Sequence, residues 1–272
     1  MYKAIVSDID ETLITEDGII SPANLAAINK AQDLGIHFIP ATGRSFNDFQ
    51  HILKATDIHN KKETYSISYN GGVTTENFEN TILDQTNLTF EQALQIFNLG
   101  VAEDVLIHVF TLTDIFTYRM NDNEKGFLDD HVVINVMETP SIEHLRDDAI
   151  LKINFQHADM TCLQAIEDSL PIELKNSLDI NYSSHRYIEF NPHGINKGNA
   201  LAKLLKRLAI QPEEVLAIGD NMNDRTMVAL AGTGVAVANA VPELKEQANY
   251  ICKNDHNNSA VSEAINKFIL NK

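Results

Sequence analysis

Short apolar runs alternate with longer amphipathic stretches at both ends of the chain. In the N-terminal part, apolar runs predict buried strands at 4–6, 37–39 and 66–69, and apolar residues recur at helical spacing after Ser21-Pro22. The C-terminal part repeats this alternation, with strands predicted at 215–218, 235–237 and 250–252 and helices at about 197–208, 224–231 and 261–269. Strands that alternate with helices predict a parallel sheet covered by helices on both faces.

The middle of the chain follows a different pattern. Between about residues 83 and 187, short alternating runs such as 106–110 and 115–118 are interspersed with helical patterns near 90–99 and 160–170. This pattern predicts an α+β insertion with an antiparallel sheet. We therefore predict an α/β protein with a Rossmann-like, doubly wound parallel sheet. Residues 1–82 and 188–272 would form its core domain, and residues 83–187 an inserted α+β cap domain.

The composition narrows the classes of partner. The chain has 272 residues and a net charge of −17, so it repels nucleic-acid backbones and anionic membranes. No apolar run approaches the ~20 residues of a membrane-spanning helix, and the N-terminus lacks a signal-peptide pattern. Cys162 and Cys252 are expected to be small buried hydrophobes rather than a disulfide, which fits a reducing cytoplasm. We expect a cytoplasmic protein with neither nucleic-acid nor membrane partners, and the sequence leaves its oligomeric state open.

Polar clusters directly follow three of the predicted strands. Residues 8–12 follow the first strand, residues 41–44 the second, and residues 219–224 the strand at 215–218. Ligands of an open α/β sheet bind at the carboxyl ends of its strands. Segments about 200 residues apart are therefore expected to meet at one edge of the sheet.

Two of these clusters carry carboxylates that suit a metal ion. Asp8 and Asp10 alternate along an extended backbone, so their side chains point in different directions and can serve different roles. Asp220 supplies a third carboxylate. Two carboxylates with a backbone carbonyl and waters suit Mg²⁺, a hard octahedral cation.

Other residues in the same set of segments suit an anion. Thr42 offers a hydroxyl donor, and Gly43 lets its backbone N–H approach an anion closely. Lys197, between Gly194 and Gly198, is a cation at a predicted helix start, where the helix dipole also favours negative charge. Each segment alone has an ordinary explanation, since Asp-x-Asp can be a solvated turn and Thr-Gly-Arg is common in loops. All of them in order indicate phosphoryl transfer, which needs charge stabilisation and in-line positioning.

Together these segments resemble the haloacid dehalogenase (HAD)-like phosphatase superfamily, and specifically its Cof-type sugar-phosphatase branch with a large α/β cap. The resemblance covers essentially the whole chain and rests on Asp8-Ile9-Asp10-Glu11-Thr12-Leu13, Ala41-Thr42-Gly43-Arg44, Gly194-Ile195-Asn196-Lys197-Gly198 and Gly219-Asp220-Asn221-Met222-Asn223-Asp224. Residues 231–240 also look like the stretch that follows the last motif in that branch.

The resemblance implies a role for each matching residue. Asp8 would be the nucleophile that forms an aspartyl-phosphate, and Asp10 would protonate the leaving oxygen and later deprotonate the attacking water. The implied ligands of Mg²⁺ are Asp8, the backbone carbonyl of Asp10, and Asp220. The implied phosphate-binding groups are Thr42, Lys197, Asn223 and the backbone amides of Ile9 and Gly43. Asp224 would be a partner of Lys197 or of the metal-bound waters.

Three positions depart from the family pattern. Glu11 stands where Gly is commoner, and Met222 stands where an acid is frequent, which removes a charge near the site. Residues 257–261 replace a more usual acid-rich stretch, so that loop is expected to differ in shape. None of the three carries a proposed catalytic role, and we expect Glu11 to have little effect.

Substrate choice is expected to lie in the cap. Possible substrate contacts in the core are Arg44, Asn70 and Gly71, although Asn70-Gly71 is first a turn. Candidates in the insertion are His108, Tyr118, Arg119, His185 and Arg186, none of which stands out from ordinary packing or surface residues.

The sequence therefore predicts a Mg²⁺-dependent phosphatase that hydrolyses small phosphorylated metabolites, such as sugar phosphates, through an aspartyl-phosphate intermediate. A sugar phosphomutase would have the same core. A non-catalytic regulatory protein that retains the fold is a third possibility, disfavoured by the intact set of motifs.

Overall fold

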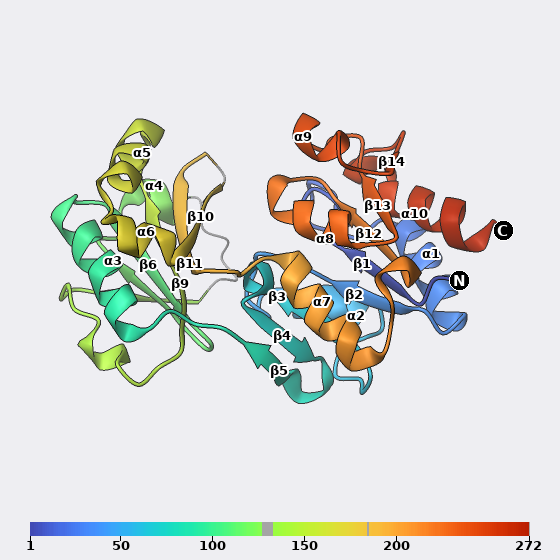
Figure 1. The fold of residues 1–272 in the computed structure, drawn as a ribbon, viewed down its shortest axis with the longest axis horizontal. Helices are drawn as coiled ribbons and strands as arrows, with labels where there is room; N and C mark the ends of the chain where they lie inside the picture. Colours follow the sequence, from blue (N-terminus) through green and yellow to red (C-terminus); the bar gives the residue numbers. More distant parts are fainter. Residues whose placement is uncertain (127–132, 184, 272) are drawn as a thin grey trace. The chain divides into compact units, whose positions relative to one another are not determined.

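A computed structural model of the protein describes residues 1–126, 133–183 and 185–271. The chain divides into two compact units (Figure 1). The core unit comprises Met1–Gln85 with Asn196–Lys272, and the cap unit comprises Thr86–Ile195. These boundaries lie three and eight residues beyond those expected at 82/83 and 187/188.

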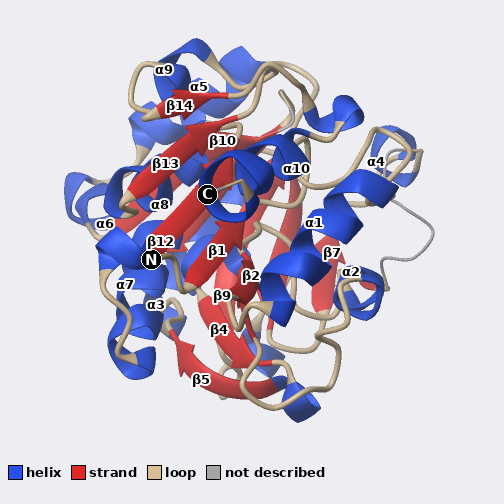
Figure 2. Ribbon diagram, turned by 90° about the vertical axis from the view of Figure 1, so that its right-hand side faces the viewer, coloured by secondary structure: helices blue, strands red, loops and turns tan. Residues whose placement is uncertain are grey.

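The core unit is built on a five-stranded parallel sheet with the order β14-β13-β12-β1-β2. The strands are β1 Ala4–Ser7, β2 His37–Pro40, β12 Val215–Gly219, β13 Thr233–Ala236 and β14 Tyr250–Ile251. Every residue of β1 and β12 is buried, as expected for central strands covered on both faces. The sheet with its flanking helices (Figure 2) confirms the predicted α/β class.

Helices cover both faces of this sheet. They are α1 Pro22–Asp33, α2 Gln50–Ala55, α7 Lys197–Leu208, α8 Arg225–Leu230, α9 Pro242–Lys245 and α10 Ala260–Ile265, which continues as a π-helical turn at Asn266–Leu270. Helix α1 packs against α10, and α7 packs against α8 (Figure 1). Side-chain caps fix two of the helix starts, since Ser21 accepts from the amide of Asn24 and Asn196 accepts from the amide of Asn199.

The third predicted strand differs from the expected parallel pattern. Strand β3 (Tyr65–Ser68) pairs antiparallel with β4 (Val73–Glu76), and β4 pairs antiparallel with β5 (Thr81–Gln85). A single parallel bridge between Ala41 and Ile67 links β3 to the end of β2. The turn at 69–72 reverses the chain, and Gly71 allows this with a φ of +101°. This small sheet also explains why the core unit extends to Gln85.

The cap unit contains a six-stranded sheet with the order β10-β11-β9-β6-β7-β8. Its strands are β6 Leu106–Thr111, β7 Ile115–Tyr118, β8 Ile134–Met137, β9 Ile150–Gln156, β10 Leu178–Ser183 and β11 Tyr187–Pro192, all antiparallel to their neighbours except β8 to β7. The helices are α3 Phe90–Ala102, α4 Asp122–Lys125, α5 Met160–Ser169 and α6 Ile172–Asn176. Because β11 pairs with β9 and β10, residues 188–192 belong to the cap sheet rather than to the core.

Alternate side chains of the cap sheet form an apolar core with the cap helices. Residues such as Ile107, Ile153 and Phe190 lie in this cluster. The other face carries buried polar side chains, including His108, Asn154 and Glu189. Both cysteines are free thiols; Cys252 is buried as expected, whereas Cys162 is only half-buried, contrary to the expectation. Among the described residues, no helix combines the length and apolar character that a membrane crossing requires.

Candidate active site

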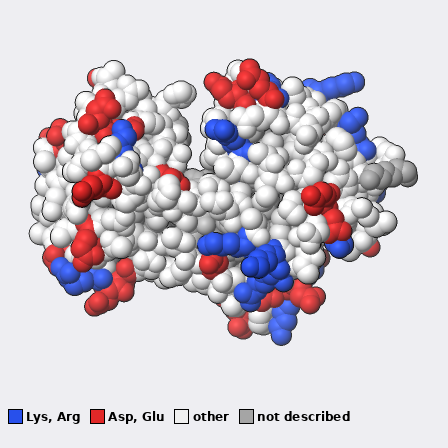
Figure 3. Space-filling model, in the orientation of Figure 1, with Lys and Arg blue, Asp and Glu red and all other residues white. Residues whose placement is uncertain are grey.

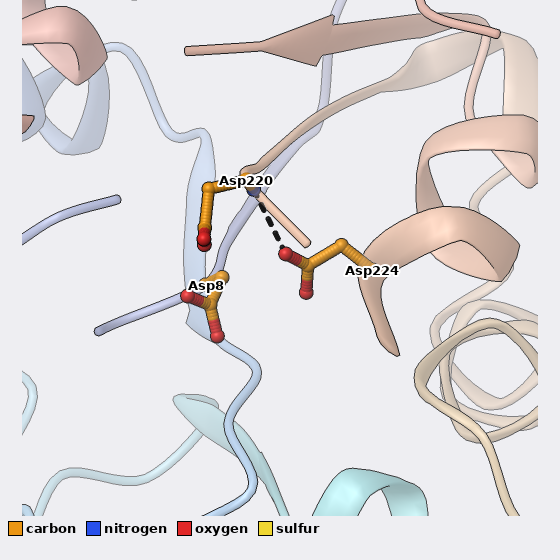
Figure 4. Close-up of side chains that lie close together, drawn as sticks. All are labelled: Asp8, Asp220 and Asp224. Carbon is orange, nitrogen blue, oxygen red and sulfur yellow. Dashed lines mark hydrogen bonds between the residues drawn. The ribbon is translucent and has the colours of Figure 1, made fainter. Parts of the chain in front are cut away.

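Two carboxylates meet at the carboxyl ends of β1 and β12. The amide of Asp8 donates to the carbonyl of Ile218 at 3.0 Å, so the strand pairing continues past β1 and brings Asp8 beside Asp220. Each of these two residues is only 5% exposed. A third carboxylate, Asp224, follows in the turn before α8, and ligand atoms of all three lie within 4.8 Å of one another (Figure 4). The expected meeting of distant segments at one sheet edge is thus present in the core unit.

Lys197 lies at the start of α7 and contacts two of these carboxylates. Its Nζ is 2.5 Å from Oδ1 of Asp8 and 2.6 Å from Oδ1 of Asp224. The side chain is completely buried. Burial disfavours the charged amine, but Asp224 and Asp8 outweigh it and raise the pKa of Lys197. The lysine is therefore a buried ammonium ion held against Asp8.

Asp224 organises the backbone at the end of β12. Its Oδ2 accepts hydrogen bonds from the amides of Asp220 (2.9 Å) and Asn221 (3.1 Å), while its Oδ1 contacts Lys197. Both oxygens of Asp224 are thus engaged within the protein. The close approach requires Gly219, because a Cβ there would lie 2.5 Å from the Asp224 side chain.

The electrostatics of the site favour a cation. Burial, reinforced by the neighbouring carboxylates, raises the pKa of Asp8 well above its ordinary value, and Lys197 only partly opposes this. Burial and Asp224 raise the pKa of Asp220 to about 7, although the Thr12 hydroxyl donates to Oδ1 of Asp220 at 2.8 Å. Crowded, buried carboxylate oxygens fit a hard divalent cation, which would favour their ionised forms.

A second group of residues lies around the end of β2 and the turn after β3. Thr42 is completely buried, and its Oγ1 accepts a hydrogen bond from the amide of Arg44 at 3.1 Å. Its own hydroxyl hydrogen is therefore free to point elsewhere. Asn223 donates from Nδ2 to Oδ1 of Asn70 at 3.1 Å, and a Cβ at Gly43 would lie 3.2 Å from that same oxygen. The Thr-Gly-Arg loop and Asn223 are thus linked through Asn70.

Asp10 differs from the buried carboxylates in its exposure and in its hydrogen-bond partner. Its side chain is 48% exposed and forms two hydrogen bonds with Arg44, Nε to Oδ2 at 3.0 Å and Nη2 to Oδ1 at 2.6 Å. Arg44, expected from the sequence to contact substrate, therefore contacts Asp10 here.

Some predicted residues have contacts that the sequence did not suggest. Gly71 lies against the start of α7, where a Cβ would be 2.4 Å from the carbonyl oxygen of Asn196. It thereby permits the close packing that positions Lys197. Thr12 was part of the first motif but had no expected role, and its hydrogen bond to Asp220 required the fold to be seen.

Four of the five cap candidates form hydrogen bonds or ion pairs within the cap unit. Tyr118 donates to the carbonyl of Ser141, Arg119 donates to the carbonyls of Gly100 and Val101, and His108 and Arg186 both contact Glu124. Their hydrogen bonds give each a structural role inside the cap.

Comparison with known proteins identifies the family of the chain. Residues 5–265 match the family model of haloacid dehalogenase-like hydrolases. A Streptococcus pyogenes serotype M6 protein with the provisional name of a phosphatase is 30% identical over 99% of both chains. A Bacillus subtilis 5-amino-6-(5-phospho-D-ribitylamino)uracil phosphatase is 29% identical, covering 98% of this chain and 96% of that protein.

The fold is also similar to that of a solved structure. A haloacid dehalogenase-like hydrolase from Bacteroides thetaiotaomicron is 28% identical, with a TM-score of 0.86 over 99% of this chain and 100% of the other. The family expected from the sequence motifs is confirmed. This chain belongs to the haloacid dehalogenase-like hydrolase family.

Proposed function

We propose that this protein is a Mg²⁺-dependent phosphatase that hydrolyses small phosphorylated metabolites through an aspartyl-phosphate on Asp8. The observation that carries the proposal is the buried cluster in which the Asp8 carboxylate lies between the Lys197 ammonium group and Asp220. Membership of a hydrolase family whose relatives are named as phosphatases supports the same reaction class.

In the first step, a carboxylate oxygen of Asp8 forms a bond to phosphorus as the bond to the leaving oxygen breaks. Lys197, 2.5 Å from Asp8, offsets the charge of the transferring group. Asp10 gives its proton to the leaving oxygen. In the second step a water attacks the aspartyl-phosphate, Asp10 takes the water proton, and inorganic phosphate leaves with Asp8 regenerated.

The metal would be held by Asp8, the backbone carbonyl of Asp10, and Asp220. When bound, Mg²⁺ would neutralise negative charge on these carboxylates and on the phosphoryl oxygens. Asp224 is assigned a supporting role, because its oxygens already hold Lys197 and two backbone amides.

The phosphoryl group would be held by donors from several segments. These are the Thr42 hydroxyl, Lys197, the amide of Asn223 and the backbone amides of Ile9 and Gly43. The free hydroxyl hydrogen of Thr42 and the burial of Lys197 support this assignment. Local donors are needed because the net charge of −17 gives an anionic substrate no general attraction.

We propose that the core unit is the catalytic domain and that the cap unit governs substrate choice. The substrate would be a sugar phosphate or a similar small phosphorylated metabolite, and one relative is named for a phosphorylated ribityl compound. Figure 3 shows a group of basic side chains at the lower centre of the visible face, with acidic side chains beside it. The net charge of −17 supports the absence of a nucleic-acid partner. A cytoplasmic location also remains part of this proposal.

The test is a screen of purified protein with Mg²⁺ against sugar phosphates, phosphorylated ribityl compounds, nucleotides and p-nitrophenyl phosphate. We expect release of inorganic phosphate and a protein-bound phosphoryl group on Asp8, detected by mass spectrometry after acid quench. Conversion of a sugar phosphate to its isomer without free phosphate would establish a mutase instead. Protein that binds Mg²⁺ but turns over none of the panel would favour the non-catalytic alternative.

A further inference from the structure

The contact between Arg44 and Asp10 has the geometry of a positioning clamp. The guanidinium donates through Nε and Nη2 to the two different oxygens of the carboxylate, at 3.0 Å and 2.6 Å. Two parallel bonds from a planar fork fix the carboxylate plane as well as its position, which a single contact does not. We infer that Arg44 positions Asp10 for proton transfer and is not primarily a substrate contact; this rests on the proposed role of Asp10 as acid and base.

The backbone of Arg44 is itself fixed from two sides. Its amide donates to Oγ1 of Thr42 at 3.1 Å, and its carbonyl accepts from the amide of Tyr69 at 2.9 Å. Thr42 is completely buried and Tyr69 is 4% exposed, so both anchors belong to the packed core. The clamp therefore ties the orientation of Asp10, which follows β1, to the rigid ends of β2 and β3.

Asp10 needs such a support because its own surroundings provide little. Its side chain is 48% exposed, whereas the side chain of Asp8 is 7% exposed. An exposed carboxylate samples several rotamers, and a displacement of a catalytic group by about 1 Å can cost ~10²-fold in rate. Each carboxylate oxygen has two lone-pair directions, so the fork occupies one on each and leaves the other for the leaving oxygen or water.

The two possible roles of Arg44 predict different kinetics. A substrate contact made equally in ground and transition states changes KM, whereas a residue that acts through Asp10 changes kcat. The positioning role also predicts that Arg44 affects kcat only while Asp10 can transfer a proton. A double-mutant cycle between the two residues therefore separates the roles.

The experiment compares wild type, Arg44→Met, Arg44→Lys, Asp10→Asn and the double variant Arg44→Met/Asp10→Asn, with p-nitrophenyl phosphate and glycerol 2-phosphate as substrates. For Arg44→Met we expect kcat to fall by roughly 10- to 100-fold with KM within about 3-fold of wild type. The loss should be larger with glycerol 2-phosphate, whose leaving alkoxide needs a proton more than p-nitrophenolate does. In the Asp10→Asn background, Arg44→Met should change kcat by less than about 2-fold.

A control removes an arginine–carboxylate contact elsewhere. Arg146 in the cap unit donates to a single oxygen of Glu143, through Nε at 3.1 Å and Nη2 at 2.6 Å, and Arg146→Met should leave kcat unchanged. Arg44→Lys keeps the charge without the fork and should recover only part of the loss, which also provides a readout if Arg44→Met fails to fold. Inorganic phosphate should inhibit wild type and Arg44→Met with similar constants.

Two outcomes would overturn the inference. One is a raised KM with unchanged kcat in Arg44→Met, which would return Arg44 to the role of substrate contact. The other is an equal loss from Arg44→Met with and without Asp10. If Asp10→Asn alone leaves kcat unchanged, the proposed role of Asp10 fails and the inference falls with it; if wild type turns over none of the substrates, the proposed function itself fails.

Discussion

Each unit of the molecule buries a lysine against carboxylates, but the two sites differ in charge balance. In the core unit, Lys197 is completely buried and contacts Asp8 and Asp224, with Asp220 close by. In the cap unit, Lys152 is 7% exposed and contacts Glu189 at 2.8 Å, its one carboxylate partner among the residues that the structure describes. The cap pair is a matched ion pair, whereas the core cluster sets three carboxylates against one ammonium group.

Because of this difference in charge balance, the pKa of Asp8 in the core unit is raised and the pKa of Glu189 in the cap unit is lowered. Burial raises the pKa of Asp8, with the neighbouring carboxylates adding to the effect and Lys197 too weak to reverse it. Burial also acts on Glu189, but Lys152 outweighs it and lowers the pKa of Glu189. A buried cluster with surplus negative charge is costly unless it binds a cation. Carboxylates whose pKa values are raised by such a surplus therefore indicate a functional site, whereas a carboxylate whose pKa is lowered by a matched cation indicates a structural ion pair. The surplus of two negative charges equals the charge that Mg²⁺ carries.

The largest expected effect comes from the nucleophile. Asp8→Asn should lower kcat by at least ~10⁴-fold, because an amide is a poor nucleophile and cannot form the acyl-phosphate. The fold should persist, since the change relieves repulsion between buried carboxylates. Steady-state phosphate release and the thermal midpoint would be measured together, and appreciable residual activity in well-folded protein would exclude Asp8 as nucleophile.

Removal of divalent cations should nearly abolish activity, and Mg²⁺ should restore it. Binding to the folded state should also raise stability, by about 2.7 kcal/mol at a concentration 100 times the dissociation constant. Asp220→Asn removes a proposed ligand and should abolish this Mg²⁺-dependent rise in the thermal midpoint. Glu189→Gln in the cap is the control, and it should leave the rise unchanged. Hydrolysis that persists in excess EDTA would contradict the proposed metal site.

The surplus charge itself could be anticipated from the sequence. Asp8, Asp220 and Lys197 each follow a predicted strand or open a predicted helix, and the carboxyl ends of neighbouring parallel strands must converge. Helix α7 has the bounds that were predicted, 197–208, and the structure shows that Asn196 caps its first turn.

Other features depended on contacts that a linear pattern does not encode. A strand was predicted at 66–69 and is observed at Tyr65–Ser68, but its composition does not specify whether its partner is parallel or antiparallel. The Arg44–Asp10 fork joins residues 34 positions apart through side-chain rotamers, which the motif spacing leaves open. The alternation at 187–192 fits either unit, and only its pairing with β9 and β10 assigns it to the cap.

Removing the Lys152–Glu189 ion pair of the cap unit should lower stability without lowering kcat. Lys152→Met would leave Glu189 buried without its cation and should lower the free energy of unfolding by roughly 3–5 kcal/mol. Replacing both residues by Met should recover most of this loss, because no unpaired charge remains. Urea unfolding would measure stability, and kcat with p-nitrophenyl phosphate should stay within about 3-fold of wild type per folded molecule. A much larger loss of kcat would show that the cap lysine is not merely structural.

The smallest expected effect is a pH dependence of opposite sign in the two units. The pKa of Asp220 is raised to about 7 in the folded protein, so in metal-free protein its stabilising protonation is lost as the pH rises through 7. The pKa of Glu189 is lowered, so its contribution is lost only as the pH falls below its ordinary value of 4.5. In EDTA the free energy of unfolding should therefore fall as the pH rises from about 5 to 7, by at most about 1.4 kcal/mol per pH unit for one group, and level off at higher pH because both states are then ionised. Asp220→Asn should lessen this slope, with the raised pKa of Asp8 accounting for the remainder, and Glu189→Gln should leave it unchanged. A slope that Asp220→Asn leaves intact would place the titrating group elsewhere.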